Sequence, residues 1–276
     1  MAKDKNINTL IIPDVHCREF WKLPVHNTLH EYPDADIVFM GDYYDPYDFE
    51  WQPSDNPLET GYNNFKQIIE LAKDNPNVKI LVGNHDISYI GSPDLCYCRH
   101  DWNNDKRNRD LFWDNYELLT ICYEKEINNK NYLFSHAGYI EQWLTCFRNK
   151  DYFKTVNNEE TKLSDFLNNK FKMTFEGYIT EADKFWNVMG QYDNYRGADG
   201  NNYASIVWTD IRTHIDWSKN FENDKTIQVF GHTYLNTDYI NINNNRYCLD
   251  SQQCFYVDDD GDIRKYNDDE ILCKTI

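Results

Sequence analysis

Five short hydrophobic runs, spread along the chain, each end in a polar signature made of carboxylate, amide or imidazole residues. The runs are Leu10–Ile12, Ile37–Met40, Val78–Val82, Tyr132–Phe134 and Ile227–Phe230. Their length and their β-branched or aromatic content predict buried strands. The signatures that follow them are Asp14-Val15-His16, Gly41-Asp42-Tyr43-Tyr44-Asp45, Gly83-Asn84-His85-Asp86, Ser135-His136-Ala137-Gly138 and Gly231-His232-Thr233. Because ligands collect at the carboxyl ends of strands in such sheets, we expect these loops to face one another.

The side chains in these signatures suit hard or borderline divalent cations. Asp14 and His16 flank a single residue, so in an extended chain both side chains point the same way and reach one cation. Asp42 can bridge two cations, because a carboxylate has two acceptor oxygens. The remaining candidate ligands are an amide oxygen and two imidazoles, those of Asn84, His136 and His232. A set without thiolates favours manganese, iron, zinc or magnesium. Two such cations about 3.5 to 4 Å apart can activate a bridging hydroxide and polarise a phosphoryl group.

His85 has no place in this set of candidate ligands and is therefore available for acid–base chemistry. It directly follows Asn84, so alternation of side chains predicts that it turns away from the cation and toward the substrate, where it can protonate the leaving oxygen. Asp45 is the predicted partner that orients and charges it. The neighbouring tyrosines, Tyr43, Tyr44 and Tyr47, either pack in the core or form the wall of a pocket for a base or an aromatic leaving group. The other histidines, His26, His30, His100 and His214, are expected to be structural or exposed.

Charge and composition narrow the class of partner. The 276 residues carry 46 acidic against 28 basic side chains, a net charge of −18, which repels extended nucleic acid. A small phosphorylated molecule or a phosphoprotein is acceptable if bound metals reverse the local sign. The chain begins without an apolar signal core and shows no segment long enough to span a membrane, so we expect a cytoplasmic protein. Its eight irregularly spaced cysteines are then expected to be free thiols. The oligomeric state stays open.

The order of predicted elements indicates one α/β domain over residues 1–276. Apolar residues at helical spacing over 58–74 predict a helix between two strands, and such a crossover implies that the strands are parallel. A loop at 91–109 is followed by a predicted helix at 110–119. A helical insertion is expected at about 141–200, with helices at 161–175 and 181–189. Further strands are predicted at 205–208, 246–249 and 254–257, and a hairpin turn at 258–262. The strand pattern alone suggests a doubly wound sheet.

The ordered signatures resemble those of the calcineurin-like metallophosphoesterase superfamily: DxH, GDxxD, GNH[D/E], a single histidine after a strand, and GHx. The resemblance covers residues 14 to about 233 and implies a four-layer α/β fold, a central β-sandwich flanked by helices. It implies that Asp14, His16 and Asp42 hold a first metal, and that Asp42, Asn84, His136 and His232 hold a second. It also implies that His85 and Asp45 form the acid pair, and that the metals are manganese or a similar divalent ion.

Within that superfamily the chain is most similar to the bacterial and phage branch of serine/threonine phosphatases and diadenosine tetraphosphate hydrolases. The similarity rests on Ser135-His136-Ala137-Gly138, on the lone Gly231-His232-Thr233 and on Leu249-Asp250. Two positions depart from the pattern. Pro46-Tyr47 replaces an arginine–glycine pair whose arginine grips the phosphate, and Cys17 replaces a glycine. The substrate contacts must then come from elsewhere, with Asn84, Arg18 and Arg212 as candidates.

Three functions remain open at this point. The first is a dinuclear metal phosphohydrolase that acts on a phosphomonoester or a small phosphoanhydride by in-line attack of a bridging hydroxide. The second is a phosphodiesterase that acts on a small or cyclic nucleotide, or a nuclease, which would need a basic approach path that a net charge of −18 does not supply. The third is a non-catalytic scaffold, for which decayed ligands would be the sign. Every expected ligand is present in the sequence, which favours the enzymes.

Overall fold

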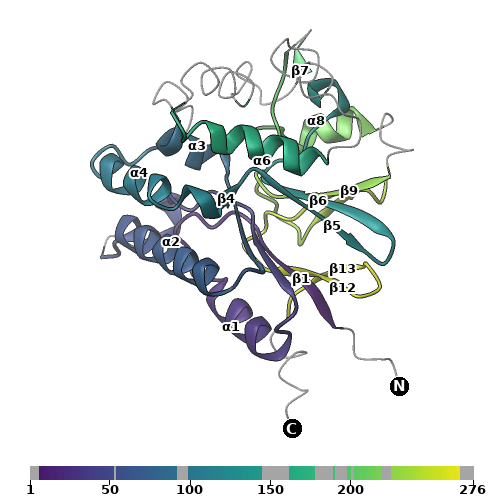
Figure 1. Cartoon of the computed structure of the whole chain (residues 1–276), viewed down its shortest axis with the longest axis horizontal. Coiled ribbons are helices and arrows are strands. Elements are labelled where there is room, and N and C mark those ends of the chain that lie inside the picture. The colour runs from purple at the N-terminus through teal and green to yellow at the C-terminus, as the bar shows by residue number, and fades with distance from the viewer. Residues whose placement is uncertain are drawn as a thin grey trace.

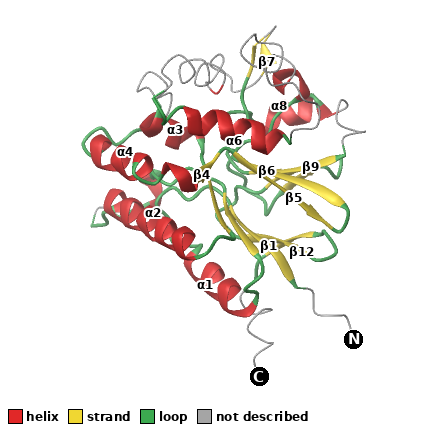
Figure 2. Ribbon diagram, in the orientation of Figure 1, coloured by secondary structure: helices red, strands yellow, loops and turns green. Residues whose placement is uncertain are grey.

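The structure, a computed structural model, describes residues 6–52, 54–91, 99–144, 162–177, 189, 198–199, 202–218 and 225–267 of the chain. Within these ranges the protein is an α/β fold in which two large β-sheets lie between helices (Figures 1 and 2). None of the helices in this part of the chain combines the length and the apolar character that crossing a bilayer requires.

The first sheet has six strands. From one edge to the other they are β13 (Ile263–Lys265), β12 (Phe255–Asp258), β1 (Ile7–Ile12), β2 (Asp36–Phe39), β3 (Val78–Leu81) and β4 (Leu119–Thr120). β1 to β4 are parallel, whereas β12 and β13 are antiparallel to their neighbours. Helix α1 (Lys22–Glu31) connects β1 to β2, and a 3₁₀ helix η1 (Asp48–Glu50) and helix α2 (Pro57–Asp74) connect β2 to β3. The parallel crossover predicted around residues 58–74 is confirmed.

The second sheet has five strands. In order they are β10 (Ile240–Ile242), β11 (Arg246–Cys248), β9 (Thr226–Phe230), β6 (Lys130–Ser135) and β5 (Cys122–Ile127). β6, β9 and β11 are parallel to one another. A separate short ribbon pairs β7 (Ala198–Asp199) with β8 (Asn202–Tyr203). Because β1 to β3 and β6, β9 and β11 form two parallel sets, the loops after these strands can gather at a common edge of the sandwich.

Side-chain alternation along the strands explains the layers. Leu10 and Ile12 of β1 belong to the same buried cluster as Phe65 of α2, whereas Ile11 between them packs with Phe134 and Val229 of the second sheet. Each fully buried apolar side chain contributes about 1.5–3 kcal/mol relative to exposure. The sheets therefore stack face to face, with α1 and α2 outside the first sheet (Figure 1). This is a sandwich between helices, not the doubly wound sheet that the strand pattern alone suggests.

Two predicted elements differ in the structure. Residues 205–208 form a turn and no strand, because the carbonyl of Ser205 accepts hydrogen bonds from the backbone N–H groups of Trp208 and Thr209. The helix predicted at 110–119 is α4 (Asp105–Trp113), followed by a 3₁₀ helix, η3 (Tyr116–Leu118). The helix ends early because Leu119 pairs with Ile80 and starts β4. The hairpin predicted at 258–262 is confirmed by the antiparallel pairing of β12 with β13.

The structure describes only part of the predicted helical insertion at 141–200. Helix α6 (Leu163–Met173) lies in the range predicted for the first of its two helices. Its Asn168 side chain accepts a hydrogen bond from Ile121 N and donates one to Cys122 O, at 2.8 Å each. These bonds fix α6 on β5, on the outside of the second sheet (Figure 1). The helix predicted at 181–189 lies outside the described residues except for Met189.

The described cysteines are buried free thiols: Cys17, Cys122, Cys248 and Cys254. Burial raises the pKa of the thiols of Cys17 and Cys122 above the ordinary value. Both therefore stay protonated at neutral pH and behave as small apolar side chains. The other four cysteines, Cys96, Cys98, Cys146 and Cys273, lie outside the described residues.

Cys17 and Gly61 form a tight contact that can be tested by mutation. A Cβ added at Gly61 of α2 would lie 2.4 Å from the Sγ of Cys17. Gly61→Ala is therefore expected to lower the free energy of unfolding by about 1–3 kcal/mol, the usual cost of overpacking. In a Cys17→Gly background the clash disappears, and the same substitution should stabilise the helix by up to about 1 kcal/mol. Urea denaturation of the four proteins measures the coupling. Equal effects in both backgrounds would show that this contact does not limit the packing of α2.

Candidate metal centre

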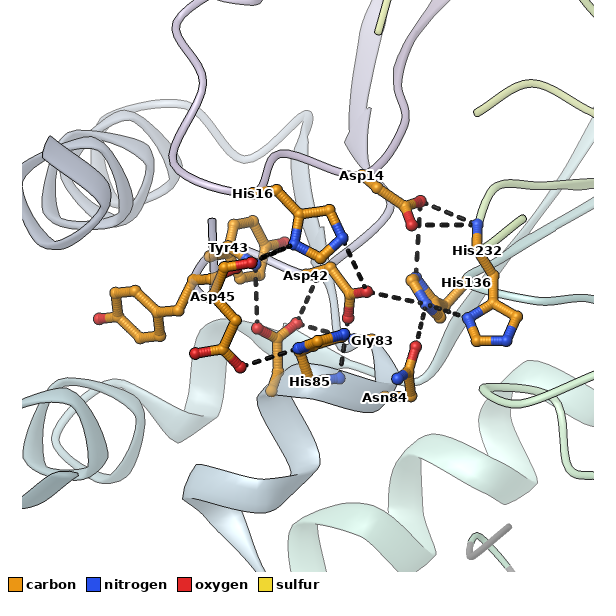
Figure 3. A network of polar contacts seen from close by, with 12 residues as sticks. Asp14, His16, Asp42, Tyr43, Asp45, Gly83, Asn84, His85, His136 and His232 are labelled. Atoms are coloured by element: carbon orange, nitrogen blue, oxygen red, sulfur yellow. Dashed lines mark hydrogen bonds and ion pairs between the residues drawn. The ribbon is translucent and has the colours of Figure 1, made fainter. Parts of the chain in front are cut away.

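The predicted site residues converge at one edge of the sandwich, where the loops after β1, β2, β3, β6 and β9 meet (Figure 3). The structure brings together eight of them, all buried: Asp14, His16, Asp42, Asp45, Asn84, His85, His136 and His232. The carboxyl ends of the two parallel strand sets supply these loops, as the sequence predicts. Residues up to 218 positions apart in the chain are in hydrogen-bond contact here, as between Asp14 and His232.

Asp42 lies between two groups of ligand atoms. Its Oδ2 is 3.4 Å from the Nε2 of His16 and 3.5 Å from the Nε2 of His136. The first group combines Asp42 with His16 and His85, and the second combines Asp42 with His136 and His232. In each group the ligand atoms lie within 4.8 Å of one another. A carboxylate shared by two such groups has the position that a bridging ligand requires.

Asn84 and Asp14 lie beside the second group. The Oδ1 of Asn84 is 2.9 Å from the Nε2 of His136, which is itself 3.1 Å from the Nδ1 of His232. The carboxylate of Asp14 accepts the backbone N–H of His232 at 2.9 and 3.2 Å. Its Oδ1 also lies 3.9 Å from the Nδ1 of His136. Asp14 thus lies within the cluster and contacts both His136 and His232.

Electrostatics test whether cations fit this cluster. Burial raises the pKa of Asp14 to about 6, with a further contribution from the charge of Asp42. Burial also lowers the pKa of His16 to about 3, so its imidazole is neutral and can act as a ligand. For Asp42, burial acts to raise the pKa, but the neighbouring His136, His85 and His16 outweigh it and hold the pKa below its usual range. Buried carboxylates beside imidazoles form a donor set that divalent cations would stabilise.

Asp250, a residue outside the predicted set, strengthens this argument. It follows β11, which is parallel to β9, so its loop opens at the same edge. Burial, together with the charge of Asp14, raises the pKa of its carboxyl well above the usual value. Its Oδ1 is buried without a hydrogen-bond partner among the described residues. Asp250 directly follows the predicted strand at 246–249, and this position at a strand end was the signal that could have placed Asp250 in the site.

The carboxylate of Asp86 fixes the shape of the loops. It accepts hydrogen bonds from three backbone N–H groups, those of Gly83, Asp42 and Tyr43, at 2.8, 2.7 and 3.0 Å. Gly83 also makes room for the Asp42 carboxylate, because a Cβ at this position would lie 2.2 Å from the Oδ1 of Asp42. The sequence shows Asp86 within a signature but gives it no role. Its function is to hold the loops after β2 and β3 together.

Two steps of the sequence reasoning used the wrong backbone geometry. His16 has a φ of 42° and is not part of an extended chain, so alternation is not what directs it toward Asp42. Asn84 and His85 are the first residues of a helix, α3 (Asn84–Ile90), and their side chains diverge by helical rotation. Asp42, Asp45 and His232 also have positive φ, at 54°, 61° and 65°. A positive φ strains the backbone of a residue other than glycine. Residues strained in this way are concentrated at functional sites, where the surrounding structure holds them in place.

His85 and Asp45 form the predicted pair. The Nδ1 of His85 is 2.8 Å from the Oδ2 of Asp45. The other carboxylate oxygen of Asp45 accepts a hydrogen bond from the hydroxyl of Tyr89 at 2.6 Å, a contact that the sequence did not indicate. With both oxygens engaged, Asp45 holds the imidazole in one orientation. The His85 ring then faces His16, with ring centroids 4.9 Å apart (Figure 3).

The aromatic residues near the site have different roles. Tyr43 and Tyr44 are buried in the core, where Tyr43 stacks on Phe65 at 4.3 Å between ring centroids. The alternative that these two tyrosines form a pocket wall is therefore wrong. Tyr47 is half-buried and places its ring 4.9 Å from that of His16. Of the predicted structural histidines, His26 and His30 are exposed, His100 is half-buried, and His214 is buried against Phe230.

The two arginines predicted as substrate contacts occupy different environments. Arg18 is half-buried beside the site, where its guanidinium makes two hydrogen bonds to Glu50, at 2.7 and 2.8 Å, and one to Asp14 O at 3.2 Å. The Arg212 side chain is 76% exposed and bonds to Asp210. The structure therefore brings Arg18 to the candidate metal-binding cluster, where Glu50 pairs with its charge. Arg212 instead pairs with its neighbour Asp210 on the surface.

Comparison with known proteins gives matches in structure only. No protein-family model matches the sequence, and no curated protein matches it. The cold-active protein tyrosine phosphatase of Shewanella sp. superposes with a TM-score of 0.53 at 13% identity, covering 94% of this chain and 80% of that one. Another structure of a cold-active protein tyrosine phosphatase gives 0.54 at 13% identity, with 95% and 79% covered. A protein serine/threonine phosphatase from Saccharomyces cerevisiae gives 0.42 at 16%, with 93% and 74% covered.

Two observations define the fold: the β-sandwich that lies between helices, and the superposition on the cold-active phosphatase structures. The chain has the four-layer metallophosphoesterase fold, as the resemblance of its signatures implies. At the edge where the parallel strands end, it carries a buried cluster of histidine and aspartate side chains that could bind metal ions.

Proposed function

We propose that this protein is a dinuclear metal-dependent phosphohydrolase of the calcineurin-like superfamily. It cleaves a phosphomonoester or a small phosphoanhydride. The observation that carries the proposal is the position of Asp42, whose Oδ2 lies 3.4 Å from His16 and 3.5 Å from His136, between two buried groups of ligand atoms. The pair formed by His85 and Asp45 lies directly beside them.

The residues fit two divalent cations. Asp14, His16 and Asp42 would hold the first, and Asp42, Asn84, His136 and His232 the second, with manganese preferred and iron, zinc or magnesium also compatible with these ligands. Two bound cations would neutralise charge on the phosphoryl group and supply a nucleophile at neutral pH. The burial of the ligands and the three backbone bonds to Asp86 keep the arrangement rigid before substrate arrives.

His85 donates the proton to the leaving oxygen. Its Nδ1 is held by Asp45, which is held in turn by the hydroxyl of Tyr89. This chain of contacts keeps the opposite edge of the imidazole facing the cluster (Figure 3). A positioned general acid of this kind contributes about 10²–10⁴-fold to the rate.

The substrate class follows from charge. A net charge of −18 disfavours extended nucleic acid, so the proposed substrate is a small phosphorylated molecule or a phosphoprotein. The finer assignment to the serine/threonine phosphatase and diadenosine tetraphosphate hydrolase branch is supported by the signatures alone. The proposed compartment is the cytoplasm, which is consistent with buried free thiols at Cys17, Cys122, Cys248 and Cys254.

The test is hydrolysis of 4-nitrophenyl phosphate against bis(4-nitrophenyl) phosphate, with and without manganese, and with the Asp42→Asn protein as background. We expect manganese-dependent turnover that strongly favours the monoester. A preference for the diester would instead support a phosphodiesterase. Absence of turnover on both compounds with every candidate metal would support a non-catalytic scaffold.

A further inference from the structure

Arg99 places an exposed guanidinium beside the His85–Asp45 pair. Its Nη2 donates a hydrogen bond to the backbone oxygen of Asp45 at 3.0 Å. The same oxygen lies 3.1 Å from the Nδ1 of His16, a predicted metal ligand. Arg99 and His16 thus share one acceptor. Asp45 O therefore links the guanidinium to His16, a member of the candidate metal-binding cluster, on the side where the proposed general acid is located.

Tyr47 provides the support for this guanidinium. The Arg99 Cζ lies 3.7 Å from the centroid of the Tyr47 ring, a cation–π contact worth about 0.5–1 kcal/mol at an exposed site. The Tyr47 ring in turn packs edge-on against His16, with 4.9 Å between ring centroids. A guanidinium has five N–H donors, and Arg99 uses them for the backbone oxygen of Asp45 and for the hydroxyl of Tyr47. These contacts hold the Arg99 side chain in place and leave other N–H groups of its guanidinium available to a ligand.

Within the described part of the chain, no aspartate or glutamate forms an ion pair with Arg99, although the sequence has 46 acidic residues against 28 basic ones. The neighbouring Arg18 differs, because Glu50 engages its guanidinium through two hydrogen bonds. A positioned cation that no described carboxylate pairs with, next to the candidate metal-binding cluster, is complementary to an anion that enters from solvent.

We propose that Arg99 binds the terminal oxygens of the substrate phosphate and selects the phosphomonoester dianion over a diester. This inference rests on the proposed phosphohydrolase function. A monoester presents three terminal oxygens and two negative charges, whereas a diester presents two oxygens and one charge, so a fork of N–H donors gains more from the monoester. Arg99 thereby supplies the phosphate contact for which the sequence offers no arginine after Asp45.

The test compares Arg99→Ala and Arg99→Lys with the matched control Arg107→Ala. Arg107 also lies over a tyrosine, 4.1 Å from the Tyr62 centroid, but it is paired with Glu59 at 2.7 Å. For Arg99→Ala we expect kcat/KM on 4-nitrophenyl phosphate to fall about 10- to 100-fold, the effect of losing charge-assisted hydrogen bonds. The fall on bis(4-nitrophenyl) phosphate should be smaller. Arg99→Lys should recover part of the loss, and Arg107→Ala should match wild type.

Binding of inorganic phosphate, measured by calorimetry on the manganese-loaded proteins, separates this inference from the proposed function. We expect its Kd to rise about 10- to 100-fold in Arg99→Ala with an unchanged manganese content. An active wild type whose kcat/KM and phosphate Kd are the same after Arg99→Ala would overturn the role of Arg99 alone. A wild type without turnover would contradict the proposed hydrolase, and the phosphate Kd would still decide whether Arg99 binds the anion.

Discussion

Replacing Asp42 by asparagine is expected to abolish phosphomonoester hydrolysis and to remove the bound divalent cations. The Oδ2 atom of Asp42 lies 3.4 Å from His16 and 3.5 Å from His136, so one substitution weakens both groups of ligands. The amide has no charge and only one acceptor oxygen, so it cannot serve both groups. We expect kcat/KM to fall by at least about 10³-fold, since the effect should exceed that of losing a single electrostatic stabiliser. The measurements are kcat/KM with saturating manganese and metal content by mass spectrometry.

The fold of this variant should survive. The Oδ1 of Asp42 accepts the backbone N–H of His85 at 2.9 Å, and an asparagine oxygen can accept the same bond. Asp259→Asn is the matched control, because it makes the same chemical change on the exposed hairpin between β12 and β13. If Asp42→Asn kept wild-type turnover or two bound cations, the bridging position of Asp42 would be the wrong interpretation.

Replacing His85 by alanine is expected to retain the metals and to lose rate. The Nδ1 of His85 bonds to Asp45, and the ring faces the cluster, so its loss removes a proton donor and spares the bridging carboxylate. We expect kcat to fall about 10²–10⁴-fold, the usual contribution of a general acid. The loss should be greater for an alkyl phosphate than for 4-nitrophenyl phosphate, because the nitrophenolate leaves readily without a proton. Comparison of the two substrates measures this difference.

Metal content decides between two roles for His85. Its ligand atom lies within 4.8 Å of those of His16 and Asp42, and a carboxylate bonded to the far nitrogen is also common behind metal-binding histidines. Loss of one cation from His85→Ala, with equal rate losses on both substrates, would make His85 a ligand and contradict the acid role. His30→Ala, which removes an exposed histidine on α1, is the control.

The sequence predicted that the candidate ligands would converge because the ends of strands place them. The runs before Asp14, Asp42, Asn84, His136 and His232 are strands in the structure, and parallel strands bring their carboxyl ends to one edge. Local pattern was sufficient to predict each of these five strands. It could not show that the strands divide into two sheets, because pairing depends on residues far apart in the chain, such as Ile7 and Asp258.

Other features depended on contacts that no local pattern reveals. The left-handed conformation of His16 is maintained by backbone bonds to another loop, His16 N to Asp42 O among them. Tyr43 and Tyr44 are adjacent to ligands in sequence, yet their rings pack in the core against Phe65. Arg99 reaches Asp45 from 54 positions away, and its surrounding sequence carries no recognisable motif.

The number of manganese ions bound per chain tests the central proposal most directly. Equilibrium dialysis of the purified wild-type protein against increasing manganese, followed by metal analysis, gives this number at saturation. Two groups of ligand atoms that share Asp42 predict saturation at two ions per chain. Saturation at one ion, or no binding above the level of the Asp42→Asn protein, would contradict a dinuclear centre.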